Sequence, residues 1–316
     1  MHQAWIITDG RAGNLRQAHA LARAAGFDTN DIAIQLRRPW RLLAPHLLAG
    51  AQWALPTPTQ LLLAPPWPRY IIGCGRQAAW ATRWLHQRAA GTSHCVQVLA
   101  PHTDPADWDL VIAPRHDGLS GPNVLTPLGS LNPVDSAWLA AARARFRALD
   151  NLPQPRTAVL LGGPRRGIAF DARFIRDWAD GLRARHVRDG GSFMLSASPR
   201  TPAPFAHAIR DALADLPGMA WLGSADGDNP YAGLLAYADR IAVTPDSVNM
   251  LSEAAASGAP VHTRHTEPLP LRLARFHAAL RDGGWLHDLE ADASAPAQPL
   301  RETHDIAATM LRRLHA

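Results

Sequence analysis

Lysine is absent from this chain of 316 residues, so all 32 of its basic residues are arginines. Cysteine is scarce too: Cys74 and Cys95 are the only two, and their spacing matches no zinc or redox motif. The chain also lacks a basic tail or stripe, because the arginines are scattered among Asp and Glu and the net charge is only +5. We therefore expect no nucleic-acid partner, and two unpaired cysteines fit a reducing cytoplasm.

A long uninterrupted apolar run is missing as well. Residues 42–64 are the most apolar stretch, but three prolines and three polar residues break it: Pro45, His46, Gln52, Pro56, Pro58 and Gln60. A membrane-spanning helix needs about 20 consecutive apolar residues, so we do not expect this stretch to cross a bilayer. Arg37, Arg38 and Arg41 precede it and tryptophans lie nearby, which is typical of a surface that rests on a membrane. The alternative is two helices packed inside the first domain.

The amino terminus begins directly with a strand-like run and shows no signal peptide. Apolar residues make up 47% of the chain and charged residues 19%, which is ordinary for a globular protein. We therefore expect a cytoplasmic protein, with the inner membrane as a place of peripheral contact.

Strands and helices alternate along the chain. The first half predicts strands at 5–8, 32–36, 69–72, 95–99 and 110–113, and helices at 15–25, 77–89 and 132–149. Residues 151–155 resemble a linker, after which strands at 158–161, 193–196, 219–222 and 240–243 alternate with further helices. This order predicts an α/β fold with two Rossmann-like parallel-sheet domains, 1–150 and 151–316, that face a cleft. A last helix at 304–315 could cross back to the first domain.

The turn after the strand at 240–243 is the most informative segment. Asp246 or Ser247 can cap a helix that ends at Gly258. Asp246, Asn249 or Met250, and Glu253 then fall on one helical face. Such a turn lies at the carboxyl edge of an open sheet, where backbone N–H groups favour phosphate. Glu253 lies far enough along the helix to accept hydrogen bonds from a sugar, although protein partners or solvent could also account for its carboxylate.

Two glycine-containing turns follow strands of the first half. Thr8 to Asn14 combines Gly10 and Gly13 with the Asp9 carboxylate, but it has no Lys-Ser/Thr ending and so is no Walker loop. It is either an active-site loop or a structural turn. Gly73 to Ala78 matches a Gly-x-Gly-x-x-Ala pattern, yet no acidic residue ends the next strand, so NAD binding is only weakly indicated. Arg76 and Gln77 of this turn could contact an acceptor or a partner domain.

Further candidates lie at other strand ends. His116 and Asp117 are neighbours after the strand at 110–113, and His116 could act as a general base or be held by local hydrogen bonds. The hydroxyls of Ser198 and Thr201 and the guanidinium of Arg200 suit phosphate oxygens. Residues 162–166 form a second phosphate-friendly loop. The Asp-x-Asp pair at 226–228 lies among turn formers, so we expect no metal there.

Six segments together carry a resemblance to a known family: residues 8–14 with Gln17, 73–77, 114–117, 198–201, 229–231 and 244–250. In this order they resemble the mitochondrial fission family named after the plant elongated-mitochondria protein, in one of its bacterial members. The plant role is to recruit a dynamin-related protein to the mitochondrial outer surface. The resemblance therefore implies an alternative function, a non-enzymatic membrane-associated adaptor that recruits partner proteins.

The second half is also similar to the donor domain of GT-B glycosyltransferases, enzymes that usually need no catalytic metal. That similarity implies that Asp246, Ser247 and Asn249 lie near the diphosphate or the sugar, and Glu253 on the ribose. The loop from Asp9 to Asn14 would face the transferred sugar. One departure is that Pro245-Asp246 replaces the familiar glycine pair before the donor helix.

The predicted function is therefore a GT-B-like nucleotide-sugar-binding protein, a glycosyltransferase acting on a lipid-linked or cell-envelope acceptor. Asp9 or His116 would be the catalytic base. A nucleoside diphosphate sugar is expected as substrate and no cofactor is expected. The residues predicted to bind substrate are Gly10, Arg11, Gly13, Asn14, Gly75, Arg76, Gln77, Gly163, Ser198, Arg200, Thr201, Asn229, Tyr231, Thr244, Asp246, Ser247, Asn249, Met250 and Glu253.

Overall fold

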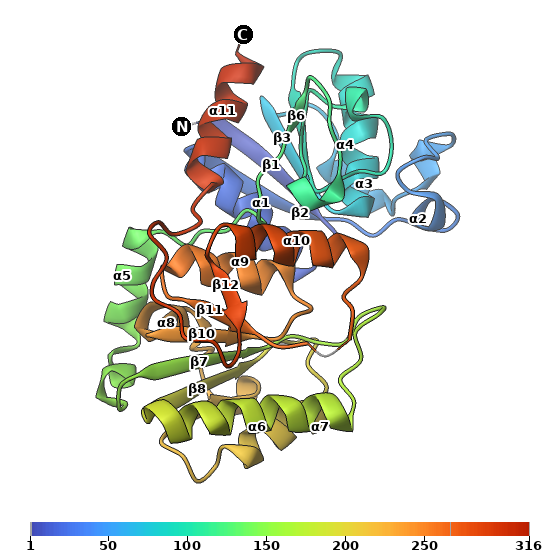
Figure 1. Cartoon of the computed structure of the whole chain (residues 1–316). Helices are drawn as coiled ribbons and strands as arrows, with labels where there is room; N and C mark the ends of the chain where they lie inside the picture. Colours follow the sequence, from blue (N-terminus) through green and yellow to red (C-terminus); the bar gives the residue numbers. More distant parts are fainter. Residues whose placement is uncertain (1, 266, 316) are drawn as a thin grey trace. The chain divides into compact units, whose positions relative to one another are not determined.

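The chain folds into two compact units, as seen in a computed structural model that describes residues 2–265 and 267–315 (Figure 1). Unit 1 comprises Met1–Pro133 and Glu302–Ala316, and unit 2 comprises Val134–Arg301. The division comes earlier than residue 150 because helix α5 (Ser136–Arg145) packs against α8 (Tyr231–Tyr237) of unit 2. The last helix, α11 (Thr303–Leu314), packs against α1 (Ala12–Ala24) and belongs to unit 1.

Unit 1 is built on a parallel six-stranded sheet in the order β2-β1-β3-β4-β5-β6. Its strands are β1 (His2–Thr8), β2 (Phe27–Ala33), β3 (Tyr70–Cys74), β4 (His94–Val98), β5 (Leu110–Ile112) and β6 (Val124–Leu125). Neighbouring residues point to opposite faces of the sheet, as Ile6 and Ile7 of β1 do. Ile6 packs with α1 and α11, and Ile7 packs with α4 (Arg76–Ala89). Short 3-10 turns occur at η2 (Pro105–Asp107) and η3 (Arg115–Asp117).

The predicted second strand, 32–36, was misplaced, since β2 runs from Phe27 to Ala33. This strand lies at the edge of the sheet and pairs only with β1. The four residues 28–31 are exposed and polar, so the strand shows no alternation of apolar and polar residues. The buried Ile34 and Leu36, which suggested a strand, come after it.

Residues 40–62 form three short helical turns rather than two packed helices. These are α2 (Trp40–Leu43), η1 (Ala51–Trp53) and α3 (Thr57–Leu62). Only part of the segment is buried: Leu55 and Leu63 are in the core, whereas several other apolar side chains are exposed. Within residues 2–265 and 267–315, we find no helix with the length and hydropathy needed to cross a membrane.

Unit 2 has a second parallel six-stranded sheet, in the order β12-β11-β10-β7-β8-β9. Its strands are β7 (Arg156–Leu161), β8 (Ser192–Ala197), β9 (Gly218–Trp221), β10 (Arg240–Val243), β11 (Val261–Thr263) and β12 (Leu286–Asp288). Its other helices are α6 (Ala172–Asp189), α7 (Ala203–Ala212), α9 (Val248–Ser257) and α10 (Leu271–Asp282), with 3-10 turns η4 (Arg147–Asn151) and η5 (Ser224–Asp226). Helices α6 and α7 cover one face of this sheet, while α8, α9 and α10 lie on the other (Figure 1).

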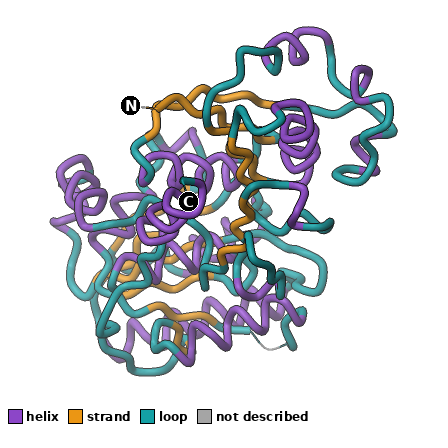
Figure 2. The backbone as a smooth tube through the Cα atoms, turned by 90° about the horizontal axis from the view of Figure 1, so that it is seen from above, coloured by secondary structure: helices purple, strands orange, loops and turns teal. Residues whose placement is uncertain are grey.

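The strand order sets the place where a ligand can enter each sheet. In unit 2 the chain leaves β7 toward β8 on one side, and later returns to β10 on the other side of β7. Loops that leave adjacent parallel strands in opposite directions open a crevice at the carboxyl edge. Figure 2 shows the loops and turns of the chain in teal, between strands in orange and helices in purple. The turn singled out from the sequence, after β10, lies at this switch point.

Candidate functional site

The carboxylate of Asp246 organises the carboxyl edge of the unit 2 sheet. Its side chain is fully buried and accepts hydrogen bonds from Thr244 Oγ1 at 2.7 Å, from Gly163 N at 3.1 Å and from Arg200 Nη2 at 3.1 Å. Thr244 Oγ1 in turn accepts a hydrogen bond from Gly162 N at 2.7 Å. Asp246 was predicted to lie near the diphosphate or the sugar; in this structure its oxygens accept hydrogen bonds from the protein.

Two glycines after β7 allow this close approach. A Cβ atom at Gly162 would lie 2.2 Å from Asp246 Oδ1, and one at Gly163 would lie 2.2 Å from the backbone oxygen of Arg200. Real Cβ atoms do not come so near to other heavy atoms, so neither position accepts a side chain without a shift of the loops. The two glycines after β7 therefore let this loop meet Asp246 and the backbone of Arg200.

Several guanidinium groups gather around this buried carboxylate. Arg200 is 54% exposed and pairs with Asp246. Arg165 donates from Nη1 to the backbone oxygen of Asp246 at 2.9 Å. Burial lowers the pKa of Arg165, and repulsion from Arg200 and Arg272 lowers it further. The two guanidiniums that contact the single carboxylate of Asp246 leave this strand end net positive, which suits a phosphate-bearing ligand.

The sequence did not single out Arg272, which lies 26 residues beyond Asp246 in the printed sequence, on α10. Arg165 lay in a loop recognised as phosphate-friendly, but only Gly163 of that loop was among the predicted ligands. No local pattern marks Arg272, because it comes near Arg165 only through the packing of α10. A rule that searched for arginines after each predicted strand would have found Arg165.

Ser247 is the N-cap of helix α9, so of the two predicted caps, Asp246 and Ser247, the structure selects Ser247. Ser247 Oγ accepts a hydrogen bond from Met250 N at 3.4 Å, and the helix ends before Gly258 at φ 96°, as predicted. Asn249 is half-buried and Met250 is buried. The first N–H groups of a helix have no partner within it, so the start of α9 adds partial positive charge beside the arginines.

Glu253 has a protein partner. Its side chain is 3% exposed, and the hydroxyl of Tyr231 donates to its Oε2 at 2.5 Å. Asn229 Oδ1 accepts from Tyr231 N at 2.9 Å and so holds the start of α8. The structure thus brings together Asn229, Tyr231 and Glu253, which were predicted from two separate segments.

Other predicted residues of unit 2 fasten its loops. Ser198 Oγ and Thr201 Oγ1 are 3.0 Å apart, and Thr201 Oγ1 donates to the backbone oxygen of Leu161 at 2.8 Å. These hydroxyls tie the loop after β8 to the end of β7, while Arg200 between them remains half exposed.

His277, which was not predicted, holds the turn after β10. Its Nε2 donates to the backbone oxygen of Pro245 at 2.9 Å, and burial lowers its pKa to about 4, so it is neutral at pH 7.

A cavity of about 670 Å³ lies within unit 2 and shares Arg165 with this site. Its described lining comes from the loop after β7, the start of α6 and the loop after β11: Pro164, Arg165, Gly167, Phe174, His265 and Leu269 among others. The volume falls in the range of about 300–1,000 Å³ that small-molecule sites occupy. The lining mixes apolar side chains with charged ones of both signs, Arg165, Asp171, Arg173 and Glu267.

In unit 1 the loops after β1 and β3 interlock. Asp9 Oδ1 accepts from Asn14 Nδ2 at 2.9 Å and from Arg11 N at 3.3 Å. Gly75 has φ 96°, and a Cβ there would lie 2.5 Å from Asn14 Nδ2. Gly10 likewise has φ 79°, which glycine adopts without strain. The Asp9 side chain stays 11% exposed, so it is held in place with one edge open.

Arg76 and Gln77 were predicted to contact an acceptor or a partner domain; in this structure their side chains bind backbone groups of the chain itself. Gln77 Oε1 accepts from Leu36 N at 2.9 Å. Arg76 donates to the backbone oxygens of Arg41, Leu42 and Ala44 at 2.9–3.2 Å. A Cβ at Gly73 would lie 2.6 Å from Thr82 Cγ2, so packing explains the glycines of the Gly-x-Gly turn without a dinucleotide.

His116, the second candidate base, lies in the turn after β5 and is 6% exposed. Its Nε2 is 3.5 Å from Asp117 Oδ1. Gly13 lies in the first turn of α1, where its backbone oxygen accepts from Gln17 Nε2 at 3.4 Å. Asp9 is therefore the more accessible of the two predicted bases.

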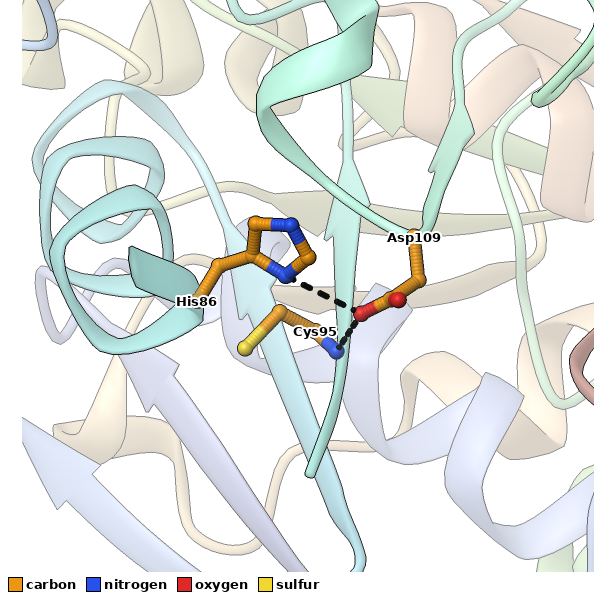
Figure 3. A group of neighbouring side chains, drawn as sticks. All are labelled: His86, Cys95 and Asp109. Carbon is orange, nitrogen blue, oxygen red and sulfur yellow. Dashed lines mark hydrogen bonds and ion pairs between the residues drawn. The ribbon is translucent and has the colours of Figure 1, made fainter. Parts of the chain in front are cut away.

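Three side chains near the amino ends of β4 and β5 form a cluster that was not predicted from the sequence. His86 Nδ1 lies 3.2 Å from Asp109 Oδ2, and that oxygen accepts from Cys95 N at 2.7 Å (Figure 3). One donor atom each from His86, Cys95 and Asp109 lies within 4.8 Å of the others, so the group could hold a metal ion. Burial raises the pKa of the Cys95 thiol, however, and the His86–Asp109 pair accounts for the arrangement without an ion.

Three solved structures have a similar fold. The UDP-GlcNAc 2-epimerase from Methanocaldococcus jannaschii is 11% identical with a TM-score of 0.58, over 99% of this chain and 100% of the epimerase. MurG from Acinetobacter baumannii is 13% identical with a TM-score of 0.50, over 100% and 95%. Os79 from O. sativa in complex with UDP is 14% identical with a TM-score of 0.52, over 99% and 94%. The chain therefore has a GT-B-like fold with two Rossmann-like domains, as predicted.

The family model Mitochondrial fission ELM1 matches residues 12–314, and the chain belongs to this family. Mitochondrial fission protein ELM1 of Arabidopsis thaliana is 29% identical over 276 residues, which cover 78% of this chain and 64% of the plant protein. The chain thus matches less than two thirds of that relative's length. An uncharacterized protein of Rickettsia prowazekii is 26% identical over 295 residues, 82% of each chain. The family predicted from the six sequence segments is confirmed.

Proposed function

We propose that unit 2 binds the diphosphate of a nucleotide sugar at the carboxyl edge of its sheet. The observation that carries this proposal is the pair of guanidiniums, those of Arg165 and Arg200, that hydrogen-bond to the buried Asp246. Arg272 lies close enough to Arg165 to lower its pKa by repulsion. One of these guanidiniums, that of Arg200, is half exposed and can turn part of its donor set toward a phosphate oxygen. The start of α9 adds N–H groups on the same side.

The remaining contacts follow from the same edge. The Glu253 carboxylate, held by the Tyr231 hydroxyl, is the proposed acceptor of ribose hydroxyl hydrogens. Ser247, Asn249 and Met250 line the first turn of α9. The epimerase, whose solved forms include a complex with UDP-GlcNAc and UDP, supports a ligand of this chemical class, since it shares the fold.

We propose further that the protein is a glycosyltransferase acting on a lipid-linked or cell-envelope acceptor. The acceptor oxygen would form a bond to the anomeric carbon as the bond from that carbon to the diphosphate oxygen breaks. Asp9 or His116 would take the acceptor proton. Arg200 and Arg165 would stabilise the negative charge that develops on the departing diphosphate.

A titration of nucleoside diphosphates, UDP first, tests the binding step. Because a hydrogen bond to a charged group contributes about 1.5–3 kcal/mol, Arg200→Ala should weaken binding by about tenfold or more. Arg165→Ala should do the same. Arg210→Ala is a matched control, since Arg210 pairs with Asp211 on the surface of α7 in the same unit. Binding that is absent, or equal in all four proteins, would overturn the proposed site.

The alternative is a non-enzymatic adaptor that recruits partner proteins at a membrane. Membership of the mitochondrial fission family and the exposed apolar side chains of residues 42–62 favour it. Transfer or hydrolysis of a bound nucleotide sugar by the purified protein would support the transferase. A purified protein that binds no nucleotide but is retained on vesicles would support the adaptor.

A further inference from the structure

Exposed apolar side chains concentrate in one segment of unit 1. Among the described residues, the large apolar side chains with high exposure are Leu42, Leu43, Trp53, Leu61, Leu62, Val187 and Leu271. Five of these seven come from residues 42–62, with Leu61 at 71% and Trp53 at 63% exposure. Scattered exposed apolar residues are normal, but a concentration in one segment marks an interaction surface.

Helix α4 holds this segment in a defined conformation. Arg76 binds three backbone oxygens between residues 41 and 44, and Arg83 donates to those of Pro45 and His46 at 3.2 Å. Trp80 Nε1 donates to the backbone oxygen of Leu47 at 2.6 Å. Beneath the exposed side chains, Ala54 and Leu55 are buried in the core. The segment is therefore folded against the rest of unit 1 in a defined conformation, and its leucines are exposed in that conformation.

The same part of the chain carries charge of one sign only. Between Asp31 and Asp104 the sequence has no acidic residue, whereas it has seven arginines. Arg37 and Arg38 are exposed just before the apolar segment, and Arg69 is exposed just after it. Figure 1 shows α2 extending from the rest of unit 1 beyond α3 and α4. Arginines beside exposed leucines and a tryptophan match the interface of an anionic bilayer, where phosphates lie above hydrocarbon.

We propose that residues 37–62 dock unit 1 onto an anionic lipid bilayer. Leu42, Leu43, Leu61, Leu62 and Trp53 enter the boundary between headgroups and acyl chains, and Arg37 and Arg38 bind lipid phosphates. The bilayer is favoured over a protein partner because both requirements, hydrocarbon and dense negative charge, occur together at its surface. This surface lies in unit 1 and does not involve the nucleotide-binding residues proposed in unit 2.

Co-sedimentation of the full chain with vesicles tests the proposal. Vesicles that contain phosphatidylglycerol should retain the protein, and vesicles of phosphatidylcholine alone should retain much less. Leu61→Ser with Leu62→Ser should reduce retention about tenfold or more. Arg37→Gln with Arg38→Gln should reduce it most at low salt, because screening already weakens the charge contribution at high salt. Val187→Ser with Leu271→Ser is the control, since it removes the two exposed apolar side chains of unit 2.

A separate experiment measures how deeply Trp53 enters the bilayer, with lipids brominated on their acyl chains. These should quench part of the tryptophan fluorescence of the wild type, and that part should be missing in Trp53→Phe. Equal retention of all variants, or no difference between the two vesicle types, would overturn the proposal. So would a dimer in solution that Leu61→Ser dissociates, because a second copy would then cover the surface. The Leu61/Leu62 variant should still bind UDP like the wild type if the nucleotide site is correct, so the two proposals fail independently.

Discussion

The Tyr231 hydroxyl donates to Glu253 Oε2 across 2.5 Å, although the two residues are 22 positions apart. Both residues were predicted to bind substrate. Their contact gives the Glu253 carboxylate a hydrogen-bond donor, although the residue is only 3% exposed and three buried alanines follow it in α9. A buried carboxylate is costly unless it is hydrogen-bonded. The tyrosine therefore fixes the position of the group proposed to accept ribose hydroxyls.

Removal of this hydroxyl should lower both stability and affinity. A buried acceptor that loses its donor costs about 1–3 kcal/mol, so Tyr231→Phe should lower the free energy of unfolding by that order in urea titrations. Nucleoside diphosphate affinity should also fall, because Glu253 loses its orientation. Tyr237→Phe is the control: it makes the same change in the same helix, where the hydroxyl donates to the backbone oxygen of Arg143. Equal effects of the two variants would argue against a special role for the Tyr231–Glu253 contact.

A side chain at Gly163 should separate the loops that form the site. In Gly163→Ala the new methyl group would meet the backbone oxygen of Arg200, and overpacking of this kind typically costs about 1–3 kcal/mol. We expect a lower unfolding midpoint in urea and weaker UDP binding. Gly223→Ala should change neither, since Gly223 has extended backbone and no atom within 4 Å of its added Cβ. A Gly163→Ala protein as stable as the wild type would contradict the interlocked geometry.

Two buried histidines should make unit 2 less stable in mild acid. Burial lowers the pKa values of His262 and His277 to about 4, whereas an unfolded histidine has a pKa near 6.5. Between these pKa values the unfolded chain binds more protons than the folded chain. The free energy of unfolding therefore falls as the pH drops from about 6.5 toward 4. Urea unfolding at several pH values in this window should show this slope. His277→Gln, which retains a donor for the backbone oxygen of Pro245, should make the slope smaller. An unchanged slope in this variant would contradict a contribution of His277 to the pH dependence.

The His86–Asp109 pair should have the opposite pH dependence. The hydrogen bond to Asp109 raises the pKa of His86 above its usual value. A raised folded pKa gives stability that is fully present below the unfolded pKa and is lost as pH rises through the folded one. Asp109→Asn should therefore lower the melting temperature more at about pH 6 than at about pH 8.5. His19→Gln is a control, because it breaks an exposed pair with Asp31 elsewhere in unit 1; the same pH profile in both variants would refute the assignment to His86.

The strands and the α9 turn could be predicted because their signals are local. The strand at 240–243 and the end of α9 at Gly258 match the structure, since apolar runs and helix caps depend on neighbours in sequence. The short strands β6, β11 and β12 and helices α8 and α10 were not predicted. Most of these are too short to show a period, so the sheet or a neighbouring helix fixes them.

The sequence by itself determined the α/β alternation, the family, and the position of the polar turns at strand ends, because periodicity and turn chemistry are properties of short segments. Only the tertiary structure decided which polar groups meet. It placed Arg165 beside Asp246 and Arg272 near Arg165, bound Arg76 and Gln77 to backbone groups of the chain itself, and left Leu61 exposed. Those outcomes depend on strand order and on the packing of distant elements. Sequence spacing alone does not contain such long-range contacts.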